Sequence, residues 1–287
     1  MKVYKISIAG IDVQLEINYE IEIHRAFQNF IVNDFKDNAL PYVIKLKEVE
    51  ALCIPEAKMF FEEGRTSIYR TEDDVFFRVF RESNINNKEI YAFNRCDLKE
   101  RKIEVDYLKQ GRSYLENLQA VFNHISWENI LLQENKLMLH ASYVETTFGG
   151  LAFSGPSGIG KSTQADLWVK HGNGRLLNGD KLILDKEENW NGYGSPYAGS
   201  SNCYINDFCE LKAICFLDQG ECCSLRLLDT AESFKRIYTG LTLNRWDGAY
   251  VERACNLAYQ LAQDIPAYEF ICTPDKNAVD FLKEKLS

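Results

Sequence analysis

The stretch Gly150–Trp168, GLAFSGPSGIGKSTQADLW, decides how the second half of this chain folds. Within it, Gly155–Ser162 fits the pattern GxxxxGK[ST] in full. The pattern follows an apolar run, Leu151–Phe153, and precedes a stretch of helical character, STQADLWVKHG. A phosphate-binding loop needs this context, with a strand before it and a helix after it. The sequence therefore predicts a strand, a loop that holds the phosphates of a nucleoside triphosphate, and a helix in which Trp168 faces the core.

Each residue type in this loop has a chemical role. Glycines let the backbone curl so that successive N–H groups face an anion, and the amino end of the following helix adds partial positive charge. Lys161 is expected to reach the outer phosphates, and Ser162 is expected to offer its hydroxyl to Mg²⁺. The predicted cofactors are ATP and Mg²⁺. The predicted nucleotide-binding residues are Gly155, Pro156, Ser157, Gly158, Ile159, Gly160, Lys161, Ser162 and Thr163.

Two further residues are candidates for the chemistry, but local sequence leaves their roles open. Asp180 follows an apolar pair in RLLNGDKLIL. At a strand end beside the loop it could ligate Mg²⁺ or accept the proton of an attacking hydroxyl. An ordinary turn acid in an NGD hairpin fits the same pattern equally well. His140 lies in the apolar alternation LMLHASYVE, where a hydrogen-bonded sheet histidine is more frequent than a catalytic one.

The first 112 residues contain short alternating segments separated by turns. These segments are KVYKISI, VQLEI, YVIKLKEV, SIYR, VFFRVF, EIYAF and KIEVDYL. They predict a mostly antiparallel, β-rich N-terminal domain over residues 1–112. The apolar residues then change to helical spacing, which predicts a bridging helix over 113–135 and a nucleotide-binding domain over 136–287. The predicted fold class is α+β or α/β, with a β-rich unit followed by a phosphate-loop domain.

The composition argues against several classes of protein. Forty-two acidic and 33 basic residues give a formal net charge of −9, and no basic patch offsets it, so nucleic acid is not an expected partner. No apolar run has membrane-spanning length, and the start, MKVYKISIAG, has no secretory or transit character. These features predict a cytoplasmic protein without a membrane partner. Nine cysteines without a CxxC pair predict reduced, mostly buried thiols rather than a zinc or redox site.

The order of four stretches resembles the kinase domain of HPr kinase/phosphorylase and its bacterial relatives, which include peptide-modifying serine kinases. The stretches are LHASYVE, GLAFSGPSGIGKST, RLLNGDKLIL and YGSPYAGSSN. The resemblance covers roughly Leu137 to Leu286. It implies a nucleotide-binding fold shared with phosphoenolpyruvate carboxykinase and distinct from that of the usual P-loop NTPases. It also implies that His140 lines the active site and that Lys161 and Ser162 act as the family's loop lysine and serine.

The chain departs from the family's pattern in two places. The HPr enzymes usually have two adjacent aspartates after the loop helix, whereas here Gly179 precedes Asp180. Asp180 would then have to serve both the metal and the proton, or another acid would substitute. The family's glycine-rich signature on the protein-substrate side is replaced by Gly194–Asn202, GSPYAGSSN, so HPr itself is not the expected acceptor. This stretch is either a plain turn or a loop whose small residues allow a close approach to a ligand.

The preferred interpretation is an ATP-dependent kinase that transfers the γ-phosphoryl group to a hydroxyl, with a serine of a peptide or protein as the expected acceptor. The predicted catalytic residues are Asp180, His140, Lys161 and Arg245, and the predicted metal ligands are Ser162 and Asp180. Arg245 could stabilise charge on the phosphoryl group, although a lone arginine more often forms a surface ion pair. Two alternatives stay open: a nucleotide-binding regulatory protein that has lost transfer, and a serine or carboxykinase-like kinase of small molecules. The sequence is compatible with a homo-oligomer.

Overall fold

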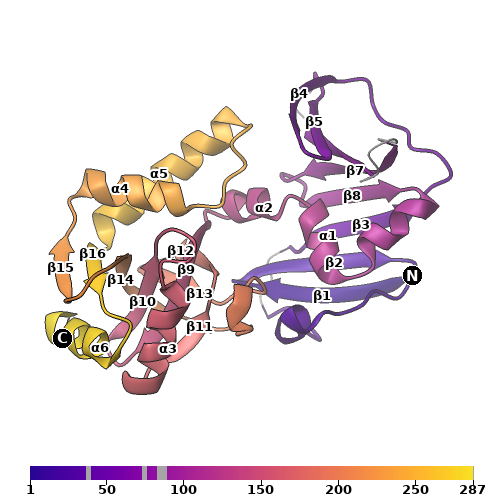
Figure 1. Cartoon of the computed structure of the whole chain (residues 1–287). Coiled ribbons are helices and arrows are strands. Elements are labelled where there is room, and N and C mark those ends of the chain that lie inside the picture. Colours follow the sequence, from indigo (N-terminus) through magenta and orange to yellow (C-terminus); the bar gives the residue numbers. More distant parts are fainter. Residues whose placement is uncertain (37–39, 73–75, 83–88, 287) are drawn as a thin grey trace. The chain divides into compact units, whose positions relative to one another are not determined.

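The chain folds as two compact units, each built around a β-sheet (Figure 1). The first unit is Met1–Ile130 and the second is Leu131–Ser287. The protein is therefore a mixed α/β chain with two sheets. No helix in the described part of the chain is long and apolar enough to cross a membrane. The computed structural model describes residues 1–36, 40–72, 76–82 and 89–286.

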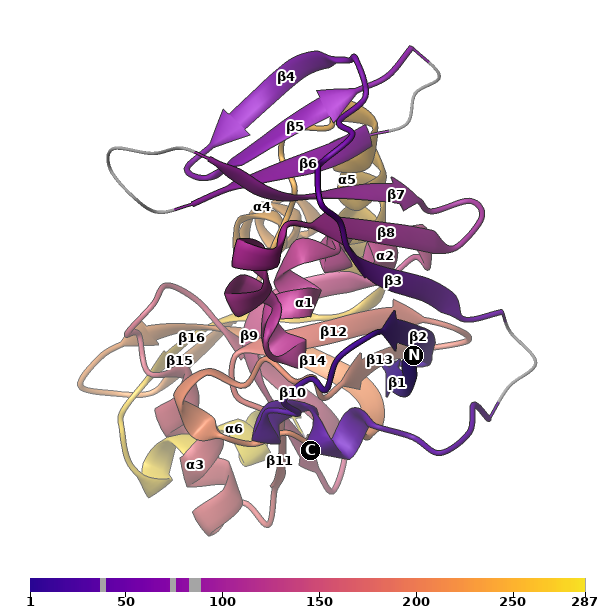
Figure 2. The same ribbon diagram turned by 90° about the vertical axis from the view of Figure 1, so that its right-hand side faces the viewer.

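An eight-stranded sheet dominates the first unit (Figure 2). Its strands run in the order β1-β2-β3-β8-β7-β6-β5-β4, in which the β2–β3 and β3–β8 pairs are parallel and the other pairs antiparallel. The predicted β-rich N-terminal part is thus confirmed. Strand β4 is absent from the prediction because its sequence, KMFFEE, does not alternate. The strands are β1 (Lys2–Ile8), β2 (Ile11–Ile17), β3 (Tyr42–Glu48), β4 (Lys58–Glu63), β5 (Thr66–Arg70), β6 (Phe76–Arg81), β7 (Ile90–Asp97) and β8 (Lys102–Tyr107).

The prediction of one continuous helix over 113–135 is wrong. Two short helices, α1 (Leu118–His124) and α2 (Trp127–Gln133), occupy this segment because Ser126 has a φ of 58° and ends the regular helix. The apolar residues whose helical spacing predicted this helix are nevertheless buried: Leu115, Leu118, Val121, Phe122 and Ile125. Helix α1 lies against the sheet, where His124 Nε2 is 2.9 Å from the Tyr91 hydroxyl of β7. Two 3₁₀ helices complete the unit: η1 (Arg25–Phe30) and η2 (Lys109–Leu115).

The second unit contains one mixed sheet in the order β10-β9-β12-β13-β14-β16-β15, with β11 paired to β9. Strand β10 also pairs in parallel with β14, so the carboxyl ends of these two strands lie at the same edge. The strands are β9 (Leu137–Thr146), β10 (Gly149–Ser154), β11 (Arg175–Asn178), β12 (Lys181–Lys186), β13 (Trp190–Tyr193), β14 (Phe208–Gln219), β15 (Ser224–Leu227) and β16 (Ala267–Cys272). The helices are α3 (Lys161–His171), η3 (Gly199–Ser201), α4 (Thr230–Gly240), α5 (Gly248–Asp264) and α6 (Lys276–Leu286).

Side chains of the central strands alternate between two cores, as strand geometry requires. Ala152 of β10 and Ile214 of β14 pack in the cluster that includes α4 and α5. Their neighbours Leu151 and Cys215 pack in the cluster that includes α3 and α6. Figure 1 shows the two helix pairs on opposite sides of the sheet. Trp168 of α3 is fully buried in the second cluster, which confirms its predicted core position.

Candidate active site

The glycine-rich loop, Gly155–Ser162, connects β10 to α3, so the predicted order of strand, loop and helix is confirmed. Three of its glycines have positive φ angles: 143° at Gly155, 80° at Gly158 and 111° at Gly160. Residues with a side chain rarely adopt such angles. Gly160 caps the amino end of α3, where the first N–H groups have no acceptor inside the helix. The loop therefore presents backbone N–H groups in a setting that attracts anions.

A cavity of about 310 Å³ lies beyond the carboxyl end of β10, against this loop. Most of the predicted site residues converge on it: His140, Ser157, Gly158, Gly160, Lys161, Ser162, Thr163 and Asp180. Gly155 and Pro156 instead line a larger neighbouring cavity. Ile159 lines neither cavity, and its side chain packs against the core on the α3 side.

The Lys161 side chain folds back onto the loop. Its ammonium group donates hydrogen bonds to the carbonyl oxygens of Gly155 and Pro156, both at 3.0 Å. Burial lowers the pKa of Lys161, whereas the nearby Asp180 carboxylate acts to raise it and the Lys181 ammonium to lower it. The Lys161 ammonium group is thus held at the start of the loop, where it interacts electrostatically with the carboxylate of Asp180.

His140 and Asp180 form a direct contact. His140 Nε2 is 2.8 Å from Asp180 Oδ1, and each side chain is about one-third exposed. Burial is the main cause that lowers the pKa of His140, and the Lys161 ammonium acts in the same direction, while Asp180 opposes it. A lowered pKa favours the neutral imidazole at pH 7, so we assign the contact as Nε2–H donating to an ionised carboxylate. The fold brings together the two residues whose roles the sequence leaves open.

Strand pairing explains how Asp180 reaches the cavity. Strands β11 and β12 both pair with β9 rather than with each other, so the alternative of a hairpin turn acid is wrong. Lys181, the first residue of β12, lies opposite His140 in the β9–β12 register. The Ala141 N–H donates to the Asp180 carbonyl oxygen at 3.0 Å. The carboxylate is therefore fixed beside the histidine by the sheet itself.

Asn178 is a positioning residue that sequence reasoning missed. It is completely buried, and its Oδ1 accepts a hydrogen bond from the Asp180 N–H at 2.8 Å. Its Nδ2 donates to Ser195 Oγ at 3.0 Å and to the Tyr197 carbonyl oxygen at 3.3 Å. The sequence feature that could have indicated this role is an amide side chain directly after the apolar pair Leu176 and Leu177. Asn178 ties the Asp180 turn to the segment Gly194–Asn202.

That segment packs closely against the turn. A Cβ atom at Gly179 would lie 2.1 Å from Ser201 Oγ and 2.9 Å from the Ala198 carbonyl oxygen, which are impossible separations. Gly199 and Ser200 line the cavity, so the segment approaches the site as one of the two sequence interpretations expects. Among the described residues that line this cavity, Asp180 is the only acid. The fold leaves no room at position 179 for the second aspartate that the HPr enzymes usually have.

Arg245 is not brought to the site. Arg245 is not among the described residues that line either cavity. Its guanidinium carbon lies 6.0 Å from the centre of the Tyr238 ring, within the range of a cation–π contact. Its predicted catalytic role therefore has no geometric support.

The donors in the cavity fit a hard cation that arrives with phosphates. Ser162 offers a hydroxyl and Asp180 a carboxylate, and Mg²⁺ is usually held by one or two carboxylates together with substrate phosphates and water. Within the described ranges, no group of three or more His, Cys, Asp or Glu side chains could hold a metal ion.

The prediction that most of the thiols are buried is wrong. Only three of the nine cysteines are buried: Cys96, Cys215 and Cys272.

The comparisons with known proteins show a distant similarity to solved structures. No family model matches this chain, and no curated protein matches it. The chain is similar to the solved structure of the HPr(Ser) kinase/phosphatase from Coxiella burnetii, at 16% identity and a TM-score of 0.32. The similarity covers 52% of this chain and 87% of that one. A similarity at this level carries no argument about function, which has to be argued from the site.

Proposed function

We propose that this protein is an ATP-dependent kinase that transfers the γ-phosphoryl group to the hydroxyl of a serine in a peptide or protein. One observation carries the proposal. A single cavity is lined by the glycine-rich loop with Lys161 and Ser162 and by the hydrogen-bonded pair of His140 and Asp180. Phosphoryl transfer needs these elements together, because positioning and charge stabilisation supply most of the catalysis.

The loop would hold the nucleotide. Backbone N–H groups at the amino end of α3 would bind phosphate oxygens, and Lys161, whose ammonium group lies beside the carbonyl oxygens of Gly155 and Pro156, would contact the outer phosphates there. Ser162 and Asp180 would hold Mg²⁺, which neutralises charge on the phosphates when it is bound. The rest of the chemistry belongs to the side chains of the chain itself.

Asp180 would accept the proton of the acceptor hydroxyl as its oxygen forms a bond to the γ-phosphorus and the bond to ADP breaks. The Nε2–H of His140 would hold the Asp180 carboxylate in place through Oδ1. A base must lie within hydrogen-bond reach of the proton that it takes, and fixing one oxygen aims the other. His140 is a positioning residue in this scheme.

A second candidate function is favoured by the glycine at position 179. The cavity has one acid where the HPr enzymes usually have two, so the protein could bind nucleotide for regulation without transferring phosphate. Transfer and binding must therefore be measured separately.

The experiment combines intact-mass analysis and ADP detection on the purified protein with ATP and Mg²⁺, alone and with a pool of serine peptides and host extract. Nucleotide binding is followed in parallel with a fluorescent ATP analogue. We expect Lys161→Ala to lose most of the nucleotide affinity. We expect Asp180→Asn to bind nucleotide but to transfer about 10²- to 10⁴-fold more slowly. Asp166→Asn, at an exposed position of α3, is the matched control and should behave like the wild type.

Each outcome selects a different conclusion. A gain of phosphate mass on an acceptor that the Asp180 variant does not produce supports the kinase. Binding of nucleotide without product on any acceptor supports the regulatory protein. Unimpaired transfer by the Asp180 variant removes that residue from the mechanism, and absence of nucleotide binding refutes both candidates.

A further inference from the structure

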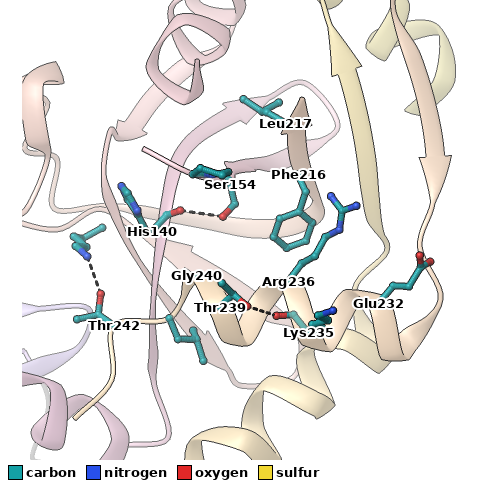
Figure 3. Close-up of a pocket in the computed structure, with 14 residues that line it drawn as sticks. His140, Ser154, Phe216, Leu217, Glu232, Lys235, Arg236, Thr239, Gly240 and Thr242 are labelled. Atoms are coloured by element: carbon teal, nitrogen blue, oxygen red, sulfur yellow. Dashed lines mark hydrogen bonds between the residues drawn. The ribbon is translucent and has the colours of Figure 1, made fainter. Parts of the chain in front are cut away.

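A second cavity, of about 640 Å³, adjoins the glycine-rich loop on its other side (Figure 3). Its walls come from the carboxyl ends of β10 and β14, from α4 and from the residues after α4. His140 lines both cavities, and Gly155 and Pro156 at the start of the loop line this one. The two cavities therefore meet at the proposed site of transfer.

The position of the Lys161 ammonium group indicates which end of the nucleotide faces this cavity. It lies on the carbonyl oxygens of Gly155 and Pro156, at the start of the loop. The lysine of such a loop contacts the outer phosphates. On the proposed function, the terminal phosphoryl group therefore lies toward Gly155 and Pro156, and the nucleoside lies toward the other end of the loop. The larger cavity is on the acceptor side.

The charges that line this cavity are mostly positive. Lys181, Lys235 and Arg236 contribute cations, and Glu232 is the single carboxylate in the lining that the structure describes. Glu232 is already paired with Arg226, with 2.9 Å between Oε2 and Nη1. Arg236 is likewise paired, with Glu269.

The two lysines are not neutralised. Lys181 Nζ donates to Thr242 Oγ1 at 2.8 Å, and the hydroxyl of Thr242, which is labelled in Figure 3, is a neutral partner. No carboxylate in the described part of the chain lies within ion-pair distance of Lys181 or Lys235. Phe216 and Leu241 add apolar surface to the lining of the same cavity. A partly apolar pocket with unpaired ammonium groups is complementary to an organic anion.

We propose that this cavity is the acceptor subsite and that it selects an acceptor with a carboxylate near the hydroxyl to be phosphorylated. In a peptide this is an acidic residue close to the acceptor serine, held by Lys235 and Lys181 while the serine reaches Asp180. The inference rests on the proposed kinase function. A free hydroxy acid or amino acid has the same chemistry, and the test distinguishes the two sources.

The test measures binding of fluorescent serine peptides by anisotropy, with and without a non-hydrolysable ATP analogue. Peptides with a glutamate at each position near the serine are compared with the same peptides carrying glutamine. We expect glutamate peptides to bind the wild type about fivefold more tightly, and this preference to fall to about twofold or less in Lys235→Gln. Lys170→Gln, at an exposed position of α3 outside the cavity, is the matched control and should keep the preference. High salt should weaken the preference, because Lys235 is exposed and Lys181 is half-buried.

The outcomes separate this inference from the kinase proposal. Equal binding of glutamate and glutamine peptides, or a preference that Lys235→Gln leaves intact, overturns the subsite even if transfer occurs. Weaker binding of the ATP analogue in Lys235→Gln than in Lys170→Gln overturns it as well, because the cavity would then hold the nucleoside. Competition by free serine that requires Lys235 supports the subsite and identifies a small acid as the source of the carboxylate. Failure of the wild type to bind nucleotide refutes the kinase, while the peptide preference measured without nucleotide still decides the subsite.

Discussion

Replacing Gly179 with alanine perturbs the site at the place where this chain departs from the HPr enzymes. The added Cβ atom would lie 2.1 Å from Ser201 Oγ, 2.4 Å from Ser201 Cβ and 2.9 Å from the Ala198 carbonyl oxygen. Ordinary van der Waals contact begins near 3.4 Å, so rotation of the serine hydroxyl does not relieve the overlap. The segment around Ser201 has to shift by about 1 Å, and Gly199 beside Asp180 shifts with it.

The expected loss of stability follows from this overlap. Overpacking of a well-packed site costs about 1–3 kcal/mol, and the contact with backbone atoms places Gly179→Ala near the middle of that range. For a unit of this size, about 2 kcal/mol lowers the unfolding temperature by about 4–8 °C. Adding Ser201→Gly removes the two shortest contacts and leaves the one at 2.9 Å. The double variant should therefore recover more than half of the lost stability.

Differential scanning calorimetry of the wild type, Gly179→Ala, Ser201→Gly and the double variant gives the comparison, with Ser201→Gly alone as the control. Tryptophan fluorescence reports mainly on the second unit, because three of the four tryptophans, Trp168, Trp190 and Trp246, belong to it and only Trp127 belongs to the first unit. A Gly179→Ala protein within about 0.5 kcal/mol of the wild type would refute the reasoning, since surface substitutions have effects of that size. A double variant no more stable than Gly179→Ala would refute it as well.

Two further predictions concern the loop and the histidine. Gly160→Ala should weaken nucleotide binding about tenfold or more, because φ is 111° while no atom lies within 4 Å of the added Cβ, so the whole effect is backbone strain. Gly10→Ala, equally open with a φ of 74° in the first unit, should leave nucleotide binding unchanged, and equal losses in both variants would contradict a local role for the loop. In an NMR titration, His140 should titrate below its ordinary value of about 6.5, and lower still in Asp180→Asn, because that carboxylate raises the pKa. Since folding lowers this pKa, the unfolded chain binds the proton first and stability falls as the pH drops below about 6.5. A midpoint that rises in the Asp180 variant would contradict the assignment.

The phosphate-loop segment was predictable because its determinants are local. The glycines that need positive φ, the apolar run before them and the helical run after them lie within Gly150–Trp168. The strand β4 and the break at Ser126 were not predictable in this way. The first has no alternation, and the second depends on how α1 and α2 pack rather than on a helix-breaking residue.

The pairing of His140 with Asp180 lies beyond local sequence for a different reason. The two residues are brought together by the β9–β12 register, and a shift of one residue would turn His140 to the other face of the sheet. Such a register is set by the packing of whole strands. The resemblance to HPr kinases implies that both residues line the site, whereas no motif of that family includes the buried amide of Asn178, which fixes the turn.

On the proposed function, the single carboxylate has to be reconciled with two tasks. Asp180 Oδ1 is engaged by the Nε2–H of His140, so Oδ2 is the oxygen that remains for the metal or the proton. A carboxylate oxygen has more than one lone pair, so Oδ1 can also serve the metal while it accepts from the histidine. The neutral state of His140 is essential to this arrangement, because only a neutral imidazole leaves the full negative charge of Asp180 available. Burial and the ammonium groups of Lys161 and Lys181 lower the pKa of His140, so they help to keep its imidazole neutral. Gly179 adds no carboxylate that would act against them.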